Sequence, residues 1–392
     1  MRKLTLVFEK LENIHLIKEV GIIPYYLSEY HGYEVEIVCY AYSKNREMRF
    51  KSDNIKIIRI NRFFDSQRFY WLGMLYYLVK HANKIGGLML YFLDGRIFWY
   101  MFFLKLLNPK CFFYIKLDLD RIRFGSLNHP DITDLRSKLN HKKLNFQIRY
   151  IFKKANLLSV ETKEIYGRLF PEWKGVDLRE KLILLPSGFD DKRTKVRVKS
   201  FKEKENIILT IGRLGSKQKN TEMLMSALEE IEDFKDWKVY LIGPIENRFK
   251  TYIKDYFERN PLLQNKIVFL GAIYKRDVLF EWLNRSKVFC LTSSWESFGN
   301  VLNEAGFFGN YIVSTNVGAA LDITDNGKLG EIIEVNDVSS LKEILEKIIK
   351  RGKDISEYSR EIHKFCKENF VWSKIVDKLD KEIKSRQSIQ NF

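Results

Sequence analysis

The sequence predicts an α/β protein with two doubly wound parallel-sheet domains, and three observations lead to this prediction. Its 392 residues exceed one ordinary core and suit two domains of roughly 150–200 residues each. Short apolar segments alternate with helix-length segments along the chain. The apolar segments carry little polar alternation, which is typical of strands in a parallel sheet that helices cover on both faces.

The expected strands and helices follow one another in both halves of the chain. The expected strands are Leu4–Phe8, Val35–Tyr40, Ile55–Ile60, Gly87–Phe92, Cys111–Leu117, Leu157–Val160, Leu182–Leu185, Asn206–Ile211, Lys238–Ile242, Lys266–Leu270, Val288–Leu291, Tyr311–Ser314 and Leu329–Ile333. The expected helices include His15–Tyr30, Gln67–Ile85, Ile97–Leu107, Asp131–Lys154, Thr221–Ile231, Ile245–Arg259, Arg276–Asn284 and Asn300–Phe308.

These elements divide the chain into an N-terminal domain, residues 1–190, and a C-terminal domain, residues 206–370. Residues 191–205 between them are polar, rich in Lys and Arg, and without a sustained apolar period, so we expect a hinge there. Residues 371–392 follow the second domain. Within them, Ser373–Lys384 has an amphipathic helical pattern and is expected to cross back to the first domain.

Positive charge is concentrated in the first half of the chain. The formal net charge is +17; residues 1–200 hold 37 Lys and Arg against 21 Asp and Glu, whereas residues 201–392 hold 30 against 29. Such asymmetry favours a surface that faces an anionic partner: nucleic acid, acidic lipid or a phosphorylated acceptor. The alternative is that the lysines only solvate helix faces. No nucleic-acid-binding module is recognisable, which argues against nucleic acid.

The composition also indicates a compartment. Four cysteines lie far apart (Cys39, Cys111, Cys290 and Cys366), so a reducing cytoplasm is expected rather than a disulfide framework. The longest apolar segments, Phe69–Val79 and Ile97–Leu104, fall short of the ~20 residues that span a bilayer. The first apolar segment is too short for a signal peptide. We therefore expect a cytoplasmic protein.

An aromatic block runs from Phe63 to Tyr114 and holds 17 of the 56 Phe, Tyr and Trp residues. Six basic residues are interleaved with it: Arg62, Arg68, Lys80, Lys84, Arg96 and Lys105. This pattern fits a peripheral face that inserts among anionic headgroups at the inner face of the membrane. It equally fits aromatic helices buried on a sheet, and both interpretations remain open.

Two loops after apolar strands carry the candidate chemistry. In the first, Glu296 follows the strand Val288–Leu291, a helix opens near Gly299, and Glu304 falls in its second turn. Backbone N–H groups at a helix start suit a phosphate, and flanking carboxylates accept hydrogen bonds from sugar and ribose hydroxyls. In the second loop, Arg213 and Lys219 are the expected cations for a diphosphate.

Together these segments resemble the family-4 retaining glycosyltransferases, which have the GT-B architecture of two Rossmann-like domains. The resemblance covers most of residues 180–335. Its motifs are Pro186-Ser187-Gly188-Phe189-Asp190, Gly212-Arg213 with Lys219-Asn220, Leu241-Ile242-Gly243, Phe269-Leu270-Gly271, Glu296 with Glu304-Ala305, and Val317-Gly318.

The resemblance implies roles for these residues. Arg213 and Lys219 would bind the donor diphosphate, Glu296 the transferred sugar and Glu304 the ribose. The backbone of Phe298, Gly299, Asn300 and Val301 would complete the phosphate site, and Ile273 would contact the base.

The N-terminal half departs from the family pattern in two places. The loop after the first strand, residues 9–14, lacks the usual glycines, and Asp118 stands where many members have a histidine. Asp118 therefore becomes the substitute candidate for positioning the sugar. Asp118 and Asp120 also form a D-x-D pattern, the metal motif of single-domain transferases. The cations Arg213 and Lys219 already neutralise a diphosphate, so we expect neither a metal nor a cofactor.

The predicted function is a metal-independent, retaining hexosyl transfer from a UDP- or GDP-linked sugar. The acceptor would be a lipid-linked or surface-polysaccharide glycan that binds the N-terminal domain. The alternatives are a sugar-nucleotide epimerase or a phosphorylase of the same architecture, and a protein that binds nucleic acid or anionic membrane through its basic half.

Overall fold

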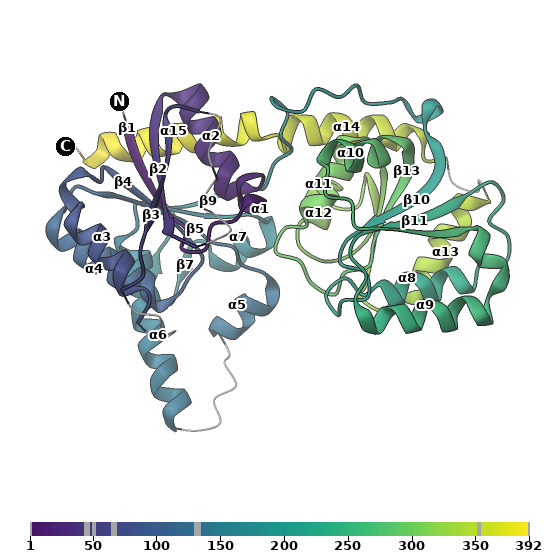
Figure 1. The fold of residues 1–392 in the computed structure, drawn as a ribbon, viewed down its shortest axis with the longest axis horizontal. Helices are drawn as coiled ribbons and strands as arrows, with labels where there is room; N and C mark the ends of the chain where they lie inside the picture. Colours follow the sequence, from purple (N-terminus) through teal and green to yellow (C-terminus); the bar gives the residue numbers. More distant parts are fainter. Residues whose placement is uncertain are drawn as a thin grey trace. The chain divides into compact units, whose positions relative to one another are not determined.

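The computed structural model describes residues 2–42, 48, 52–63, 69–128, 135–350 and 354–390. The chain forms two compact units. Unit 1 contains Met1–Pro186 and Trp372–Phe392, and unit 2 contains Ser187–Val371. Each unit is a parallel β-sheet with helices on both faces (Figure 1). The predicted fold class is confirmed, including the return of the C-terminal helix to the first domain. Residues 191–205, the predicted hinge, are part of unit 2, and their hinge role stays a prediction.

The sheet of unit 1 has seven parallel strands in the order β3-β2-β1-β4-β5-β6-β9. Its strands are β1 Arg2–Val7, β2 Tyr33–Tyr40, β3 Ile55–Ile60, β4 Gly87–Tyr91, β5 Phe112–Lys116, β6 Leu157–Val160 and β9 Leu182–Leu184, and a small hairpin is formed by β7 Glu172–Trp173 and β8 Val176–Asp177. Its helices are α1 Asn13–Leu16, α2 Glu19–His31, α3 Leu72–Lys80, α4 Gly95–Leu107, α5 Arg121–Asn128, α6 Leu135–Lys154, α7 Lys163–Leu169 and α15 Trp372–Gln390.

The two faces of this sheet pack against different helices because side chains alternate along each strand. On β4, Leu88 and Leu90 belong to a core with α3, α4 and α6. Met89 and Tyr91 belong to a second core with α2 and α15. Figure 1 shows α15 on the same side of the sheet as α2, and the two helices are in contact.

The sheet of unit 2 has six parallel strands in the order β12-β11-β10-β13-β14-β15. Its strands are β10 Glu205–Ile211, β11 Lys238–Ile242, β12 Ile267–Gly271, β13 Ser286–Leu291, β14 Tyr311–Thr315 and β15 Gly330–Ile333. Its helices are α8 Thr221–Glu229, α9 Asn247–Arg259, α10 Arg276–Arg285, α11 Asn300–Phe307, α12 Ala320–Ile323, α13 Val338–Ile349 and α14 Ser356–Asn369. One face packs on α8, α9 and α13, and the other on α10, α11, α12 and α14.

Some expected helices have different bounds. The expected helix His15–Tyr30 is divided into α1 and α2. The division lies at Ile17 and Lys18. Gly21, in the first turn of α2, permits the close packing of the two helices, since a Cβ on Gly21 would stand 2.2 Å from the Leu16 carbonyl oxygen. The helix expected to end at Ile85 is α3 followed by a 3-10 turn, Ala82–Lys84. The expected starts Gln67 and Asp131 lie outside the described residues.

The aromatic block contributes to both the core and the surface. Tyr100, Phe113 and Tyr114 are buried, whereas Tyr76 and Phe102 are exposed. Phe64 and Arg68 of this block lie outside the described residues. Within the described part of the chain, no helix combines the length and apolar character needed to span a membrane.

Candidate active site

The two predicted diphosphate-binding loops meet at one point of the unit 2 sheet. The loop with Arg213 and Lys219 follows β10, and the loop with Glu296 follows β13. These strands are neighbours, and the strand order runs away from them in opposite directions. Ligands bind at such a switch point, beyond the carboxyl ends of the strands, in doubly wound sheets. The loops are also bonded to each other, since the Ser294 N–H donates to the Gln218 carbonyl over 2.8 Å.

A short ion pair joins the predicted cation to the predicted carboxylate. Lys219 Nζ lies 2.5 Å from Glu296 Oε1, and the Ser293 hydroxyl donates to the same oxygen over 2.7 Å. The exposed fractions of the two side chains are 18% for Lys219 and 8% for Glu296. Because both groups are shielded from water, their attraction is stronger than that of a surface pair.

Gln218 links this pair to the second predicted cation. Its amide nitrogen donates to the Trp295 carbonyl over 3.1 Å and to Glu296 Oε2 over 3.4 Å. Its amide oxygen accepts from the Arg213 guanidinium over 2.8 Å. Arg213, Lys219 and Glu296 therefore belong to one hydrogen-bonded group within unit 2. Gln218 and Ser293, which no sequence argument selected, hold that group together.

The predicted phosphate-binding backbone begins at Gly299, which precedes α11. Gly299 has a φ of 86°, a conformation that favours glycine, and lets the chain turn sharply into the helix. The Phe298 side chain is buried in the core, and its backbone carbonyl accepts the Ala319 N–H over 2.8 Å. Asn300 and Val301 form the first turn of α11, where backbone N–H groups have no helical partner. This turn can accept an anion.

Glu304 has a partner that the sequence did not suggest. Its Oε1 accepts from the Arg276 guanidinium over 2.7 Å, and Arg276 is the first residue of α10. Ile273, the candidate for contact with the base, lies in the loop before α10 and packs against the core on that face. The sequence could not predict the Arg276–Glu304 pair, because it depends on how α10 and α11 pack against each other.

Asp118 lies in unit 1, beyond β5, and its carboxylate pairs with Arg123 over 3.3 Å. Asp120 accepts the Arg123 N–H over 2.7 Å, at the start of α5. In the described ranges no group of three or more His, Cys, Asp and Glu side chains is arranged to hold a metal ion. The D-x-D carboxylates thus both contact Arg123.

A buried charge cluster lies next to Asp118. Lys116, at the end of β5, has a fully buried side chain that pairs with Glu19 over 2.9 Å and with Glu161 at shorter range. Burial alone would lower the pKa of Lys116, but Glu161 and Glu19 outweigh it and raise the pKa. Burial and Glu19 raise the pKa of Glu161 to about 8, although Lys116 opposes this shift.

Comparison with known proteins identifies the family to which the site residues of unit 2 belong. Residues 191–365 match the family model described as Glycosyl transferases group 1. The chain carries a glycosyl transferases group 1 domain. This domain contains Arg213, Lys219, Glu296 and Glu304, so the predicted family resemblance is confirmed for the motifs within residues 191–365. Asp118 and the motif Pro186–Asp190 lie outside the matched residues.

Two curated relatives and one solved structure show how far the similarity extends. Spore coat protein SA of Bacillus subtilis (strain 168) is 26% identical over 56% of this chain and 57% of its own length. The capsular polysaccharide biosynthesis glycosyltransferase CapM of Staphylococcus aureus is 29% identical over 36% of each chain. Each alignment thus covers less than two thirds of the relative.

The solved structure is Anabaena Alr3699/HepE in complex with UDP and glucose, which superposes with a TM-score of 0.69. It matches 98% of this chain and all of its own, at 13% identity. At that identity the likeness establishes the fold alone. The GT-B architecture thus extends beyond the glycosyl transferases group 1 domain to unit 1.

Proposed function

We propose that the chain is a retaining glycosyltransferase that moves a sugar from a UDP- or GDP-linked donor to a hydroxyl of a glycan acceptor. The observation that carries this proposal is the Lys219–Glu296 pair at the switch point of unit 2, within the glycosyl transferases group 1 domain. CapM is named for capsular polysaccharide biosynthesis, which supports a surface-polysaccharide or lipid-linked acceptor. The UDP and glucose in the Anabaena structure support a UDP-linked hexose as donor.

In the proposed reaction, the bond from the sugar's anomeric carbon to the diphosphate breaks, and a bond to the acceptor oxygen forms on the same face. The acceptor proton leaves with the departing diphosphate. Lys219, Arg213 and the first turn of α11 would stabilise the negative charge that grows there. Glu296 would orient the sugar, Glu304 would hold the ribose, and Asp118 would take the place of the family histidine.

The first test is a thermal-shift panel of UDP, GDP, ADP and dTDP, each with its common sugar derivatives. One nucleotide and its sugar should raise the midpoint of unfolding, because a ligand that binds the folded state stabilises it. Mass spectrometry should then detect that sugar on a lipid-linked glycan. Epimerised donor, or a product that requires phosphate, would instead identify an epimerase or a phosphorylase.

The same transfer assay tests metal independence, which we propose because two cations face the diphosphate. EDTA should leave the rate nearly unchanged. Complete loss of activity that Mn²⁺ restores would assign a metal to Asp118 and Asp120 and contradict this part of the proposal.

We further propose that unit 1 contacts an anionic membrane from the cytoplasmic side. A groove of about 890 Å³ between α6 and β8 is lined by five cations and one carboxylate: Lys142, Arg149, Lys153, Lys154, Lys181 and Asp177. Asp177 already pairs with Arg179 over 2.6 Å. Burial, Lys154 and Lys153 lower the pKa of Lys181, so an anion would relieve the mutual repulsion of these lysines. Phe146 lines the same groove and is 64% exposed.

Flotation with vesicles tests this contact. Lys153→Glu with Lys154→Glu should lower binding to phosphatidylglycerol-containing vesicles by at least about tenfold, since each basic residue near such a surface contributes about 1 kcal/mol. The matched control is Lys250→Glu with Lys254→Glu, which reverses two exposed lysines of α9. Equal flotation with neutral phosphatidylcholine vesicles, or equal loss in both variants, would contradict the proposal.

A further inference from the structure

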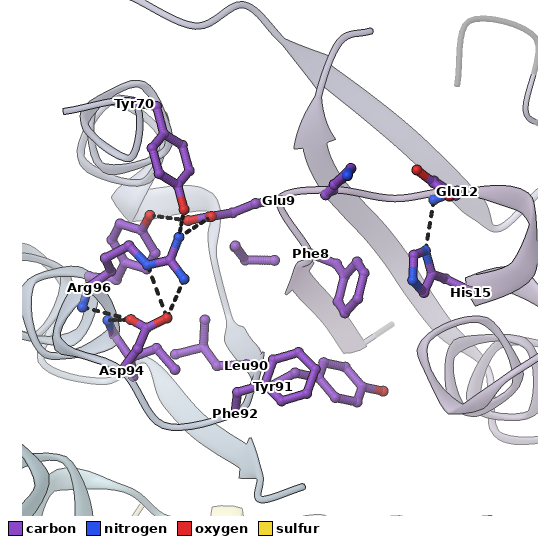
Figure 2. A pocket seen from close by; sticks show the side chains of 14 residues that line it. Phe8, Glu9, Glu12, His15, Tyr70, Leu90, Tyr91, Phe92, Asp94 and Arg96 are labelled. Carbon is purple, nitrogen blue, oxygen red and sulfur yellow. Dashed lines mark hydrogen bonds and ion pairs between the residues drawn. The ribbon is translucent and has the colours of Figure 1, made fainter. Parts of the chain in front are cut away.

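A cavity of about 510 Å³ lies in unit 1 at the carboxyl ends of β1 and β4, which pair in the sheet. Figure 2 shows its walls, which come from the loop after β1, from α1 and from the start of α4. The loop after β1 is the segment where this chain lacks the glycines of its family. Its side chains, Phe8, Glu9 and Glu12 among them, line the cavity instead.

One wall is aromatic. The Phe8 ring centroid lies 4.8 Å from that of His15, 5.9 Å from that of Tyr91 and 6.3 Å from that of Phe92 (Figure 2). Phe92 is 40% exposed. The apolar C–H face of a pyranose ring packs well on exposed aromatic rings, and Phe8 and Phe92 offer such a surface.

The backbone of Phe92 is strained. Its φ is 68°, in the left-handed region that a bulky residue rarely adopts, and its N–H donates to the Lys116 carbonyl over 3.1 Å. Such a conformation costs about 1–3 kcal/mol and concentrates at functional sites. A glycine would remove this cost, so the presence of a large aromatic residue in the cavity wall points to a task for its ring.

The opposite wall is polar. Arg96 is held between two carboxylates, with its Nη1 2.5 Å from Glu9 Oε2 and its Nε 3.0 Å from Asp94 Oδ2 (Figure 2). The Tyr100 hydroxyl donates to Glu9 Oε1 over 2.7 Å. The guanidinium charge is therefore neutralised. Asp94 already accepts two hydrogen bonds on each oxygen, from the N–H groups of Arg96 and Ile97 and from the Arg96 guanidinium, whereas each Glu9 oxygen accepts one and retains capacity for another. This wall therefore offers carboxylate oxygens that can accept hydrogen bonds from hydroxyl groups, and its paired Arg96 guanidinium offers no free positive charge that would attract an anion.

His15 adds a donor. The Glu12 N–H donates to His15 Nδ1 over 2.9 Å, so in the neutral ring the proton is on Nε2. Burial and Lys18 lower the pKa of His15, which favours this neutral form. Glu9, Glu12 and Asp94 outnumber Lys10 and Arg96 among the charged residues of the wall, so an anionic ligand would be repelled.

We propose that this cavity binds an uncharged sugar residue, stacked on Phe8 and Phe92 and hydrogen-bonded through its hydroxyls to Glu9 and His15. The binding of a sugar here is independent of the proposed function. Only the identification of that sugar as the accepting end of the glycan rests on the proposed function. The proposal differs from the expectation drawn from net charge, because the basic excess of the first half of the chain lies elsewhere, for example in the α6 groove. The accepting sugar is thus neutral even where the glycan carrier is anionic.

Saturation-transfer NMR on the full chain, without any donor, tests this site. The probes are methyl glycosides of glucose, galactose, mannose and N-acetylglucosamine, with methyl glucuronide as the anionic counterpart. At least one neutral glycoside should receive saturation at its C–H protons, and the glucuronide should bind at least tenfold more weakly than its neutral parent. No neutral binding, or glucuronide binding of equal strength, would overturn the proposal.

Phe92→Gly separates a binding role from a structural one. The change relieves the left-handed strain, so the thermal midpoint should stay the same or rise, while glycoside affinity should fall about tenfold with loss of the stacking ring. Phe102→Ala, which removes an exposed aromatic residue of α4 outside the cavity, is the control and should bind normally. A lower midpoint with unchanged binding in Phe92→Gly would assign the ring to packing and reject the site.

Failure of this proposal is distinguishable from failure of the proposed function. A chain that responds to a nucleotide in the thermal-shift panel but binds no neutral glycoside would reject the cavity assignment and leave transferase activity standing. A chain that binds a neutral glycoside through Phe92 but responds to no nucleotide would support the cavity and reject the transferase.

Discussion

Replacing Lys219 by alanine should lower the turnover of sugar transfer by about 10²–10³-fold, comparable to the loss of one preorganised transition-state donor elsewhere. The ammonium group would stabilise the departing diphosphate, and it also balances the nearly buried Glu296 carboxylate, 2.5 Å away. Single-turnover kinetics with the donor identified by thermal shift would measure the change. Arg213→Ala should cause a loss of the same order, because it removes the second cation of the group.

Lys217→Ala is the matched control, since it removes an exposed lysine from the same loop two residues away. Its turnover should remain close to that of the unmodified chain. Unchanged activity in both Lys219→Ala and Arg213→Ala would reject the diphosphate assignment, and an equal loss in Lys217→Ala would indicate that only the general positive charge of the loop matters.

Replacing Lys116 by methionine should lower the free energy of unfolding by about 3–5 kcal/mol above the folded-state pKa of Glu161, because it leaves the buried, ionised Glu161 carboxylate without its partner. Lys116 is fully buried and pairs with both Glu19 and Glu161. Urea unfolding at a pH above that pKa would measure the loss. Lys110→Met, on an exposed lysine of the preceding turn, should change stability little. A loss below about 1 kcal/mol in Lys116→Met would show that the carboxylates relax to water or share a proton.

The same cluster gives stability a pH dependence. The folded-state pKa of Glu161 is raised to about 8, above the value of about 4.3 for an unfolded chain. Between these values the folded state binds the extra proton, so the contribution of Glu161 to stability is present at low pH and is lost as pH rises toward 8. In Glu161→Gln, the free energy of unfolding, measured by urea titration at several pH values, should no longer show this decrease as pH rises toward 8.

The sequence predicted the position of candidate site residues best where those residues directly follow a strand. Lys219 and Glu296 could be placed after two strands because apolar segments define those strands, and parallel sheets gather their carboxyl ends at one edge. That these two side chains pair with each other could not be predicted. The pairing depends on Gln218, Ser293 and the adjacency of β10 and β13, which are tertiary features.

Where neighbouring elements set the geometry, sequence patterns were less informative. The apolar periodicity of residues 15–30 continues through the turn at Ile17 and Lys18, so it could not indicate that the helix divides there. The Arg276–Glu304 pair depends on how α10 lies beside α11. In the loop after β1, the missing glycines marked a departure from the family. They did not indicate the cavity that Phe8, Glu9 and Phe92 line, because Phe92 follows a separate strand, β4.

The return of α15 to unit 1 constrains how the chain matures on the ribosome. Tyr33 of β2 donates a 3.0 Å hydrogen bond to Asp380, and Trp372, Val376 and Leu379 complete one of the two unit 1 cores. These residues are synthesised only after all of unit 2. The first half of the nascent protein therefore stays incomplete, with one apolar side uncovered, until the whole of unit 2 and then α15 have been made.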